Sequence, residues 1–427
     1  MTLITTSLLS LIATAVKVGA GIIINKAIAI YIGPSGLALI GQFQNFMQVA
    51  MTAAQGGINA GITKYTSEYR AKKQSTAPLF GTTIRITLSC SLVVGVCIAV
   101  FSRAASARLL GTEGYIYIFI LFGLTLTFFA LNQLLLSIIN GLKEVNTYIK
   151  INISQSLVSL IFSTVLIIFF GLEGALLALV TNQSIVFLLI IWKIRKHPLL
   201  SLGDFSARFD KKQAKKLMAY SAMALTTAAI VPISHMLLRR YLGESLGWEQ
   251  AGYWQAIWYI SNTYLMVVTT ALSIYYLPRL SELTSKKDIR RELFNGYKLI
   301  LPLVSVLACL IFLLKDFIIA ILFTADFLPM RKLFMWQLIG DVIKLAAWLL
   351  SYLMLAKALS RMYIVTEILF AASFVGFTII FVDRFGLIGT TYAFALNYTI
   401  YFFTIAWLMR SYISTRANRA DPDDQLI

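Results

Sequence analysis

Charged side chains inside otherwise apolar runs are the residues of this sequence best suited to chemistry. Asp341 and Lys344 lie three residues apart and share a helical face with Gln337 and Trp348. One interpretation is structural and pairs Asp341 with Lys344. The other makes Asp341 a carrier of a proton or cation and Lys344 a ligand for an anion. Glu367 has no obvious local partner, so it is a second candidate for a protonatable coupling group.

Basic residues form a second group of candidates. Lys17 stands near the middle of the first apolar run and Lys26 near the end of that run, while His235, Arg239 and Arg240 end a later run. Lys26 also fits snorkelling to the membrane interface, and the other three also fit anchoring there. The balance of buried charge is positive. A cavity of that sign suits an anionic substrate, such as a phosphate or pyrophosphate head group, better than an organic cation.

The apolar run at residues 37–62 carries a stripe of polar residues at helical spacing. Its members are Gln42, Asn45, Gln48, Thr52, Gln55 and Asn59. Such a stripe cannot face lipid, so it must face protein or water. Interhelical hydrogen bonding is the structural alternative. The length of the stripe favours a hydrated cavity, and we expect Gln42, Asn45 and Gln48 to contact substrate.

The composition of the chain indicates that its apolar segments lie in a membrane. Of the 427 residues, 59% are apolar and 13% are charged, and the mean hydropathy is +0.78. Soluble domains are about 45–50% apolar and about 25% charged, so soluble, disordered and disulfide-scaffold classes are excluded. Continuous rather than alternating apolar runs argue against a β-barrel. The three cysteines fall in apolar runs, and two histidines are too few for an imidazole site, so we expect no metal and no cofactor.

The apolar runs predict an all-α integral membrane protein with 12 transmembrane helices. The runs lie near residues 5–31, 37–62, 82–102, 115–139, 149–170, 174–192, 217–241, 252–278, 298–323, 333–356, 362–382 and 388–409. The first run is too long for a signal peptide. Connectors after even-numbered runs, with the C-terminal tail, hold 25 of the 37 Lys and Arg residues, and connectors after odd-numbered runs hold 8. This asymmetry places both termini in the cytoplasm and accounts for the net charge of +18 without nucleic acid.

The second half of the chain repeats the first at a spacing of 215 residues. Phe170–Gly174 matches Phe385–Gly389, and Asn182 matches Asn397. Six runs per repeat give both halves the same orientation, as in transporters built from two rocking bundles. We therefore expect two pseudo-symmetric six-helix lobes. The predicted bounds are 1–200 for the N-terminal lobe, 201–216 for a cytoplasmic connector, 217–410 for the C-terminal lobe and 411–427 for a cytoplasmic tail.

Missing features narrow the function further. The sequence has no phosphate-binding Gly-Lys-Thr loop and no ATPase domain, so ion or substrate gradients must supply any energy. Short outer connectors argue against glycosyltransferases and glycan polymerases. Two alternatives stay open: an ion-coupled exporter of small molecules or drugs, and a membrane glycosyltransferase or polymerase with an outer-loop carboxylate.

Several segments together resemble the Wzx flippases of the multidrug/oligosaccharidyl-lipid/polysaccharide exporter superfamily. They are Val16–Gly21, Gly33–Leu37, Gly61–Tyr65, Leu277–Ser281 and Met330–Lys344. The resemblance covers roughly residues 1–410. It implies a non-enzymatic flippase that moves an undecaprenyl-pyrophosphate-linked oligosaccharide, the repeat unit of O-antigen or enterobacterial common antigen, across a bacterial inner membrane. The implied partners are this substrate, membrane lipids, the glycan polymerase and the chain-length regulator.

The resemblance also places charged residues in a central cavity at Lys17, Lys26, Asp341 and Lys344. We expect Lys17, Arg239, Arg240 and Lys344 to neutralise the pyrophosphate, and the polar stripe to hydrate the sugars. Asp341 or Glu367 would bias alternating access by protonation. Such a bias requires different ligand affinities in the inward and outward states.

Overall fold

The structure is a computed structural model that describes residues 3–194, 202–272, 276–283, 285–357 and 359–417. The described residues are helical and contain no β-strand. They form two compact units, Met1–Met236 and Leu237–Ile427. The predicted lobe bounds remain a prediction, and the end of the predicted tail, residues 418–427, lies outside the described residues.

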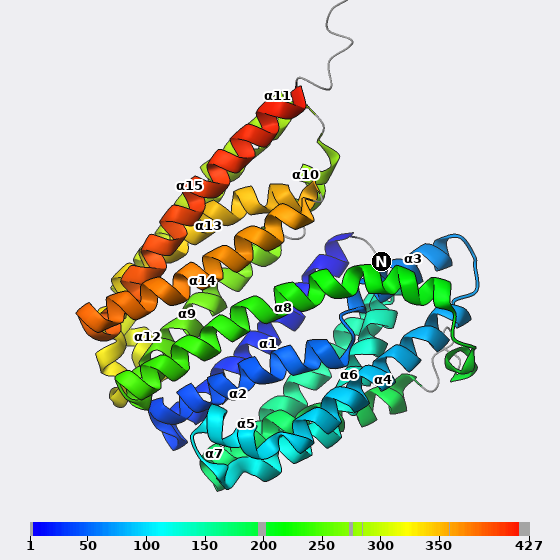
Figure 1. The fold of residues 1–427 in the computed structure, drawn as a ribbon, viewed down its shortest axis with the longest axis horizontal. Coiled ribbons are helices and arrows are strands. Elements are labelled where there is room, and N and C mark those ends of the chain that lie inside the picture. Colours follow the sequence, from blue (N-terminus) through cyan, green and yellow to red (C-terminus); the bar gives the residue numbers. More distant parts are fainter. Residues whose placement is uncertain (1–2, 195–201, 273–275, 284, 358, 418–427) are drawn as a thin grey trace, which may run out of the picture. The chain divides into compact units, whose positions relative to one another are not determined.

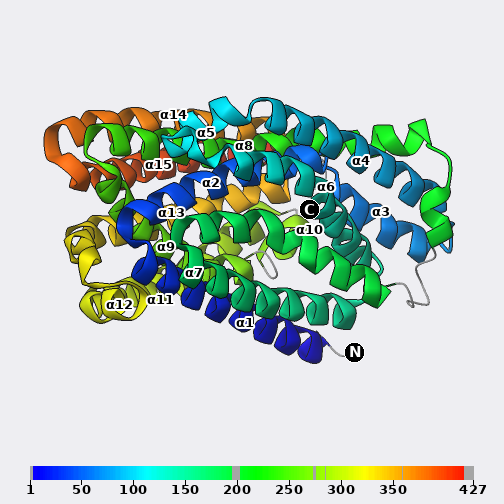
Figure 2. The same ribbon diagram turned by 90° about the horizontal axis from the view of Figure 1, so that it is seen from below.

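The first unit is built around four long helices. Its elements are α1 (Leu3–Tyr31), α2 (Gly33–Ala54), α3 (Asn59–Ala71), α4 (Ala77–Val100), α5 (Ser102–Leu110), η1 (Glu113–Tyr115), α6 (Ile116–Gly141), α7 (Val145–Ile194), η2 (Leu202–Ser206) and part of α8 (Lys211–Ser245). Helix α1 runs alongside α7, and α6 packs against both α4 and α7 (Figure 2). Rings of Phe43 and Phe119 meet edge to face at 5.3 Å and join α2 to α6.

The second unit holds the rest of α8 and the remaining helices. They are α9 (Trp248–Ala271), α10 (Leu277–Glu282), α11 (Lys286–Leu313), α12 (Lys315–Leu322), η4 (Ala325–Leu333), α13 (Phe334–Ala356), α14 (Ser360–Phe385), η5 (Gly386–Ile388) and α15 (Gly389–Ala417). Helix α15 packs against α13 and α14 (Figure 1). Helix α13 also contacts α9, α10 and α11, so it is the central helix of this unit.

Most of the apolar runs predicted from sequence coincide with these helices. The run at 298–323 is divided, because α11 ends at Leu313 and α12 begins at Lys315. Seven stretches of the described residues are long and apolar enough to cross a membrane, and the protein is a multi-pass membrane protein. Two of these stretches, Val145–Leu188 and Ser360–Tyr412, are 44 and 53 residues long. A single span needs about 20 residues. Each of the two long stretches is therefore long enough to cross twice.

Both long stretches turn at glycines that are 215 residues apart. Gly171 interrupts α7 with φ 53° and ψ −127°, and Gly386 ends α14 with φ 63° and ψ −150°. Only glycine adopts this backbone region without strain. Three residues later, a Cβ at Gly174 would lie 1.9 Å from the Leu166 carbonyl oxygen, and one at Gly389 2.2 Å from that of Phe381. The repeated Phe-Gly-Leu-x-Gly motif thus encodes the same tight turn in both units.

The matched asparagines also have matching partners. Asn182 donates a hydrogen bond to Ser159 at 2.5 Å, and Asn397 accepts one from Ser373 at 2.6 Å. In each unit the bond links the two helices that flank the glycine turn. The 215-residue repeat is therefore visible as repeated local structure.

The expected continuous helix over residues 37–62 is wrong. Helix α2 ends at Ala54, and α3 begins at Asn59. Between them, Gly56 and Gly57 take φ values of 65° and 64°. At Gly57 an added Cβ would lie 2.9 Å from the Ser221 carbonyl oxygen, so α8 approaches closely there. The predicted polar stripe is thus divided between two helices and does not lie on one face.

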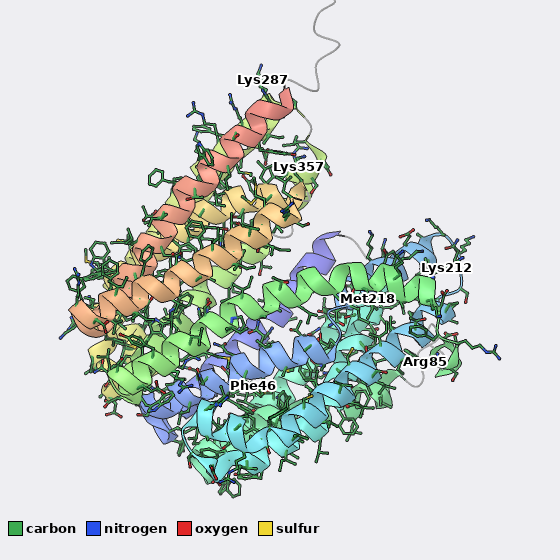
Figure 3. All side chains as sticks on the ribbon, in the orientation of Figure 1. Phe46, Arg85, Lys212, Met218, Lys287 and Lys357 are labelled. Atoms are coloured by element: carbon green, nitrogen blue, oxygen red, sulfur yellow. The ribbon has the colours of Figure 1, made fainter. Side chains whose placement is uncertain are left out.

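Arg85 of α4, labelled in Figure 3, links α4 to the segment between η2 and α8 by a hydrogen bond. Its guanidinium donates to the carbonyl oxygens of Gly81, at 3.1 Å, and Ala207. Phe80 and Phe205 stack with ring centroids 5.5 Å apart. Arg85 thus joins two segments that lie 122 residues apart in the chain.

The crossing of α4 and α6 depends on two glycines and provides a test of the fold. An added Cβ at Gly95 would lie 2.5 Å from the Gly123 carbonyl oxygen, and the reverse distance is the same. We expect Gly95→Ala to lower the free energy of unfolding by about 1–3 kcal/mol, because the helices must separate. Gly376→Ala is the control, since nothing lies within 4 Å of its Cβ. Thermal unfolding in detergent measures both, and equal melting temperatures would contradict the proposed crossing.

Candidate functional site

Helix α13 carries a buried polar face through the centre of the second unit. Gln337, Asp341, Lys344 and Ser351 are 0%, 0%, 5% and 4% exposed. Their spacings of four, three and seven residues place them on one side of a helix. A buried charge is costly unless it is paired or hydrogen-bonded, so the partners of these residues define the site.

Asp341 is held by three hydrogen-bond donors. Ser261 and Tyr264 of α9 donate to its Oδ2 at 2.7 and 2.9 Å, and Gln337 donates to its Oδ1 at 3.4 Å. These three bonds give both oxygens of the Asp341 carboxyl group a hydrogen-bond donor. Gln337 Oε1 is buried and has no hydrogen-bond partner among the described residues. The hydroxyl and amide donors around Asp341 therefore satisfy its oxygens without a basic side chain.

Lys344 lies in a cage of aromatic rings. Its Nζ is 4.8 Å from the ring centroid of Trp348, 5.1 Å from that of Trp258, 5.6 Å from that of Tyr398 and 5.9 Å from that of Phe394. These rings come from α13, α9 and α15. Each cation–π contact contributes about 0.5–2 kcal/mol, and the larger values apply where water is excluded. The cage thus stabilises an ammonium group away from bulk water.

One of the two interpretations of Asp341 and Lys344 predicts an ion pair between them. No carboxylate oxygen of the described residues lies within ion-pair distance, 4.0 Å, of Lys344 Nζ. The ion pair of the structural interpretation is therefore not formed. Asp341 is satisfied by hydroxyl and amide donors, and Lys344 by rings. The anion-binding role of Lys344 stays a prediction.

Glu367 belongs to a shorter polar chain beside the cage. It accepts a hydrogen bond of 2.9 Å from the Tyr401 hydroxyl, which lies 2.9 Å from Ser351 Oγ. Glu367 is half-buried, and Tyr401 is its single hydrogen-bond donor among the residues that the structure describes. Sequence had suggested no local partner, and the partner comes from α15, 34 residues further along the chain. Glu367 has fewer stabilising donors than Asp341.

Sequence reasoning found α13 and Glu367 but missed the residues that surround them. Those residues are Trp258, Ser261 and Tyr264 on α9, and Phe394, Tyr398 and Tyr401 on α15. One available signal was the high density of Tyr, Trp and Phe in these two segments. In an isolated sequence that signal also fits ordinary packing.

The predicted rim residues have separate surroundings. Arg239 is 1% exposed, donates to Gln255 Oε1 at 2.6 Å and lies 5.6 Å from the Trp254 ring centroid. Arg240 is exposed and forms a 2.7 Å ion pair with Glu244 one turn away. Such surface ion pairs contribute little to stability, and the choice between anchoring and substrate binding at Arg240 stays a prediction. His235 is half-buried on α8 in the first unit.

The candidates of the first unit are dispersed along α1 and α2. Lys17 is exposed, and Lys26 is half-buried. Gln42 is 1% exposed and donates to the Met236 carbonyl oxygen of α8 at 3.2 Å, so it links two helices. Asn45 is half-buried and its Nδ2 has no partner among the described residues, while Gln48 is exposed. Their roles in substrate binding remain predictions.

The fold is that of transporters of the MOP superfamily. A multidrug resistance MATE family transporter of this superfamily, solved in an inward-facing conformation, matches with a TM-score of 0.77 and 16% identity, over 95% of this chain and 96% of that one. A MOP superfamily transporter from Pyrococcus furiosus matches with a TM-score of 0.69 and 15% identity, over 94% of each chain. Identities this low establish the fold alone.

The family is established by sequence. Residues 4–284 match the polysaccharide biosynthesis protein family, and the chain belongs to it. The lipid III flippases of Escherichia coli K12 and Shigella flexneri are each 32% identical to this chain over 402 residues, covering 94% of this chain and 97% of the relative. The resemblance to Wzx flippases is thereby confirmed.

Proposed function

We propose that this protein is a lipid-linked oligosaccharide flippase that moves an undecaprenyl-pyrophosphate-linked repeat unit from the cytoplasmic to the periplasmic leaflet of a bacterial inner membrane. The observation that carries the mechanism is the caged ammonium group of Lys344. It lies in the buried centre of the second unit and has no carboxylate within ion-pair distance among the described residues. Full-length similarity to lipid III flippases supports the substrate class. Whether the repeat unit is that of common antigen or O-antigen is part of the proposal.

The proposed topology has 12 spans, two six-helix lobes and both termini in the cytoplasm. Seven candidate stretches give nine spans if each of the two long ones crosses twice, with its turn at the glycine. Helices α2, α8 and α9 bring the number to 12. The lobes 1–200 and 217–410 would rock about the substrate. The glycan polymerase and the chain-length regulator, which act on the translocated unit, are the proposed protein partners.

The proposed mechanism needs no covalent step. Lys344 binds the pyrophosphate, and charge-assisted bonds of this kind contribute about 1.5–3 kcal/mol each. Lys17, Lys26, His235, Arg239 and Arg240 would guide or retain the anion, and Gln42, Asn45 and Gln48 would contact the sugars. Asp341 keeps the site organised through its three donors. Glu367, with one donor, is the proposed protonatable group that couples the site to an ion gradient.

Lipid analysis after deletion of the gene tests this function. We expect complete undecaprenyl-pyrophosphate-linked repeat units to accumulate with their sugars accessible only from the cytoplasmic face. Surface glycan should disappear and return with a plasmid-borne copy. Normal lipid pools together with normal glycan would contradict the proposal. Increased drug sensitivity alongside them would favour the small-molecule exporter.

A further inference from the structure

An open groove of about 790 Å³ lies between α14 and α15 in the second unit. Its lining is apolar apart from Arg361, Ser360 and two threonines. The threonine hydroxyls of Thr366 and Thr404 donate to backbone carbonyl oxygens of their own helices. The groove therefore offers hydrocarbon contacts along its length and presents few free polar groups.

The two ends of this groove differ in chemical character. Arg361, Val365 and Leu369 follow each other at intervals of four residues, so they form one stripe along α14. Val365 and Leu369 are 47% and 60% exposed. Arg361 is exposed at the first turn of α14 and has no hydrogen bond or ion pair among the described residues. A free guanidinium thus stands at one end of an apolar channel.

The groove has the length of one lipid leaflet. From Arg361 to Phe370 the helix rises about 14 Å at 1.5 Å per residue, and half of a hydrocarbon core is about 15 Å. By the predicted topology, the Arg361 end faces the cytoplasm. An amphiphile with an anionic head at Arg361 and a hydrocarbon chain toward Phe370 would fit both ends.

The inner end of the groove contacts the buried polar centre. The Phe370 ring, which lines the groove, meets the Tyr401 ring edge to face at 4.7 Å. Tyr401 in turn donates to Glu367 at 2.9 Å. A chain lying in the groove would press on Phe370, one ring away from the proposed coupling carboxyl. Continuity with the proposed site favours the transported lipid over a bulk phospholipid.

We propose that the α14–α15 groove is a loading site for the polyprenyl chain of the lipid-linked substrate, with Arg361 holding its pyrophosphate before translocation. This inference rests on the proposed function. In this proposal the polyprenyl chain is bound by the protein, and it does not remain in the bulk lipid during transport. It also assigns to Arg361, Val365 and Leu369 a role in substrate selection that none of the central charges provides.

Binding of undecaprenyl pyrophosphate without sugars to the purified full-length protein in phosphatidylcholine nanodiscs tests the groove. We expect Val365→Trp, which fills it, and Arg361→Gln, which removes the charge, each to weaken binding about tenfold or more. Ile380→Trp and Arg384→Gln are matched controls, because they change the exposed residues Ile380 and Arg384 on the same helix. Both controls should bind as the unmodified protein does.

Competition with phosphatidylglycerol distinguishes a site for the polyprenyl substrate from a site for any anionic phospholipid. We expect phosphatidylglycerol to displace undecaprenyl pyrophosphate poorly. Unchanged polyprenyl binding in both groove variants would overturn the proposal, as would strong phosphatidylglycerol binding that only the groove variants lose. The gene-deletion experiment tests the proposed function separately. Normal lipid pools after deletion, together with groove-dependent binding, would refute flipping but not the groove site. Accumulation of the lipid-linked repeat unit after deletion, together with binding that the groove variants do not weaken, would refute the groove site alone.

Discussion

Lys344→Met is expected to abolish surface glycan while the protein still folds and inserts. Methionine matches the apolar stem of lysine, and its sulfur packs favourably on aromatic rings such as Trp258 and Trp348. Replacing a buried charge by an apolar side chain of similar volume is often neutral or stabilising. A purely structural Lys344 would therefore tolerate the change. A substrate ligand would lose about 1.5–3 kcal/mol of charge-assisted bonding, which is at least about tenfold in affinity.

The measurements are surface glycan in a deletion strain, protein abundance in the membrane and the melting temperature in detergent. Lys315→Met is the matched control, because Lys315 also lies over a ring, 4.3 Å from the Phe312 centroid, but outside the buried centre. It should leave glycan unchanged. Normal glycan in cells that carry Lys344→Met would remove Lys344 from the mechanism.

Glu367→Gln is expected to make flipping slow and insensitive to an imposed proton gradient, with stability preserved. A glutamine oxygen can still accept the bond from Tyr401, but the side chain no longer titrates. Asp341→Asn should behave differently. Asparagine keeps one acceptor oxygen, so its new NH2 group would face either the hydroxyl donors of Ser261 and Tyr264 or the amide donor of Gln337. An unsatisfied buried polar group costs about 1–3 kcal/mol. We therefore expect less folded protein with this second change.

Proteoliposomes with a fluorescent lipid-linked oligosaccharide measure the gradient response, and unfolding in detergent measures stability. Glu249→Gln is the control, because Glu249 also accepts a hydrogen bond from a tyrosine, Tyr253, one turn away on α9. It should keep the gradient response of the unmodified protein. A gradient response that survives Glu367→Gln would contradict its coupling role, as would an unmodified protein that ignores the gradient.

Local pattern was enough to predict much of this protein. Most of the apolar runs coincide with observed helices, because the length and hydropathy of a span follow from the membrane itself. The turns at Gly171 and Gly386 were visible as a repeated motif, since positive φ is a property of single residues. The buried face of α13 followed from the spacing of Gln337, Asp341 and Lys344.

Contacts between side chains on different helices were harder to predict. The stripe on residues 37–62 was extended through Gly56 and Gly57, because helices lie on both sides of these glycines and the polar residues keep a helical spacing across them. The ion pair between Asp341 and Lys344 was a reasonable expectation from their three-residue spacing. It did not form, because better-placed donors and rings are available on α9 and α15.

The amino-acid sequence by itself determined the membrane as solvent, most of the helical segments, the repeat and the polar face that carries Asp341 and Lys344. These depend on composition and on periodicity within one helix. Only the tertiary structure decided that Ser261 and Tyr264 reach Asp341 from 80 and 77 residues away, that four rings enclose Lys344, and that Arg361 stands at the end of an open groove. Contacts of this kind depend on how each helix is rotated and tilted against its neighbours, and packing across the whole unit sets that rotation and tilt.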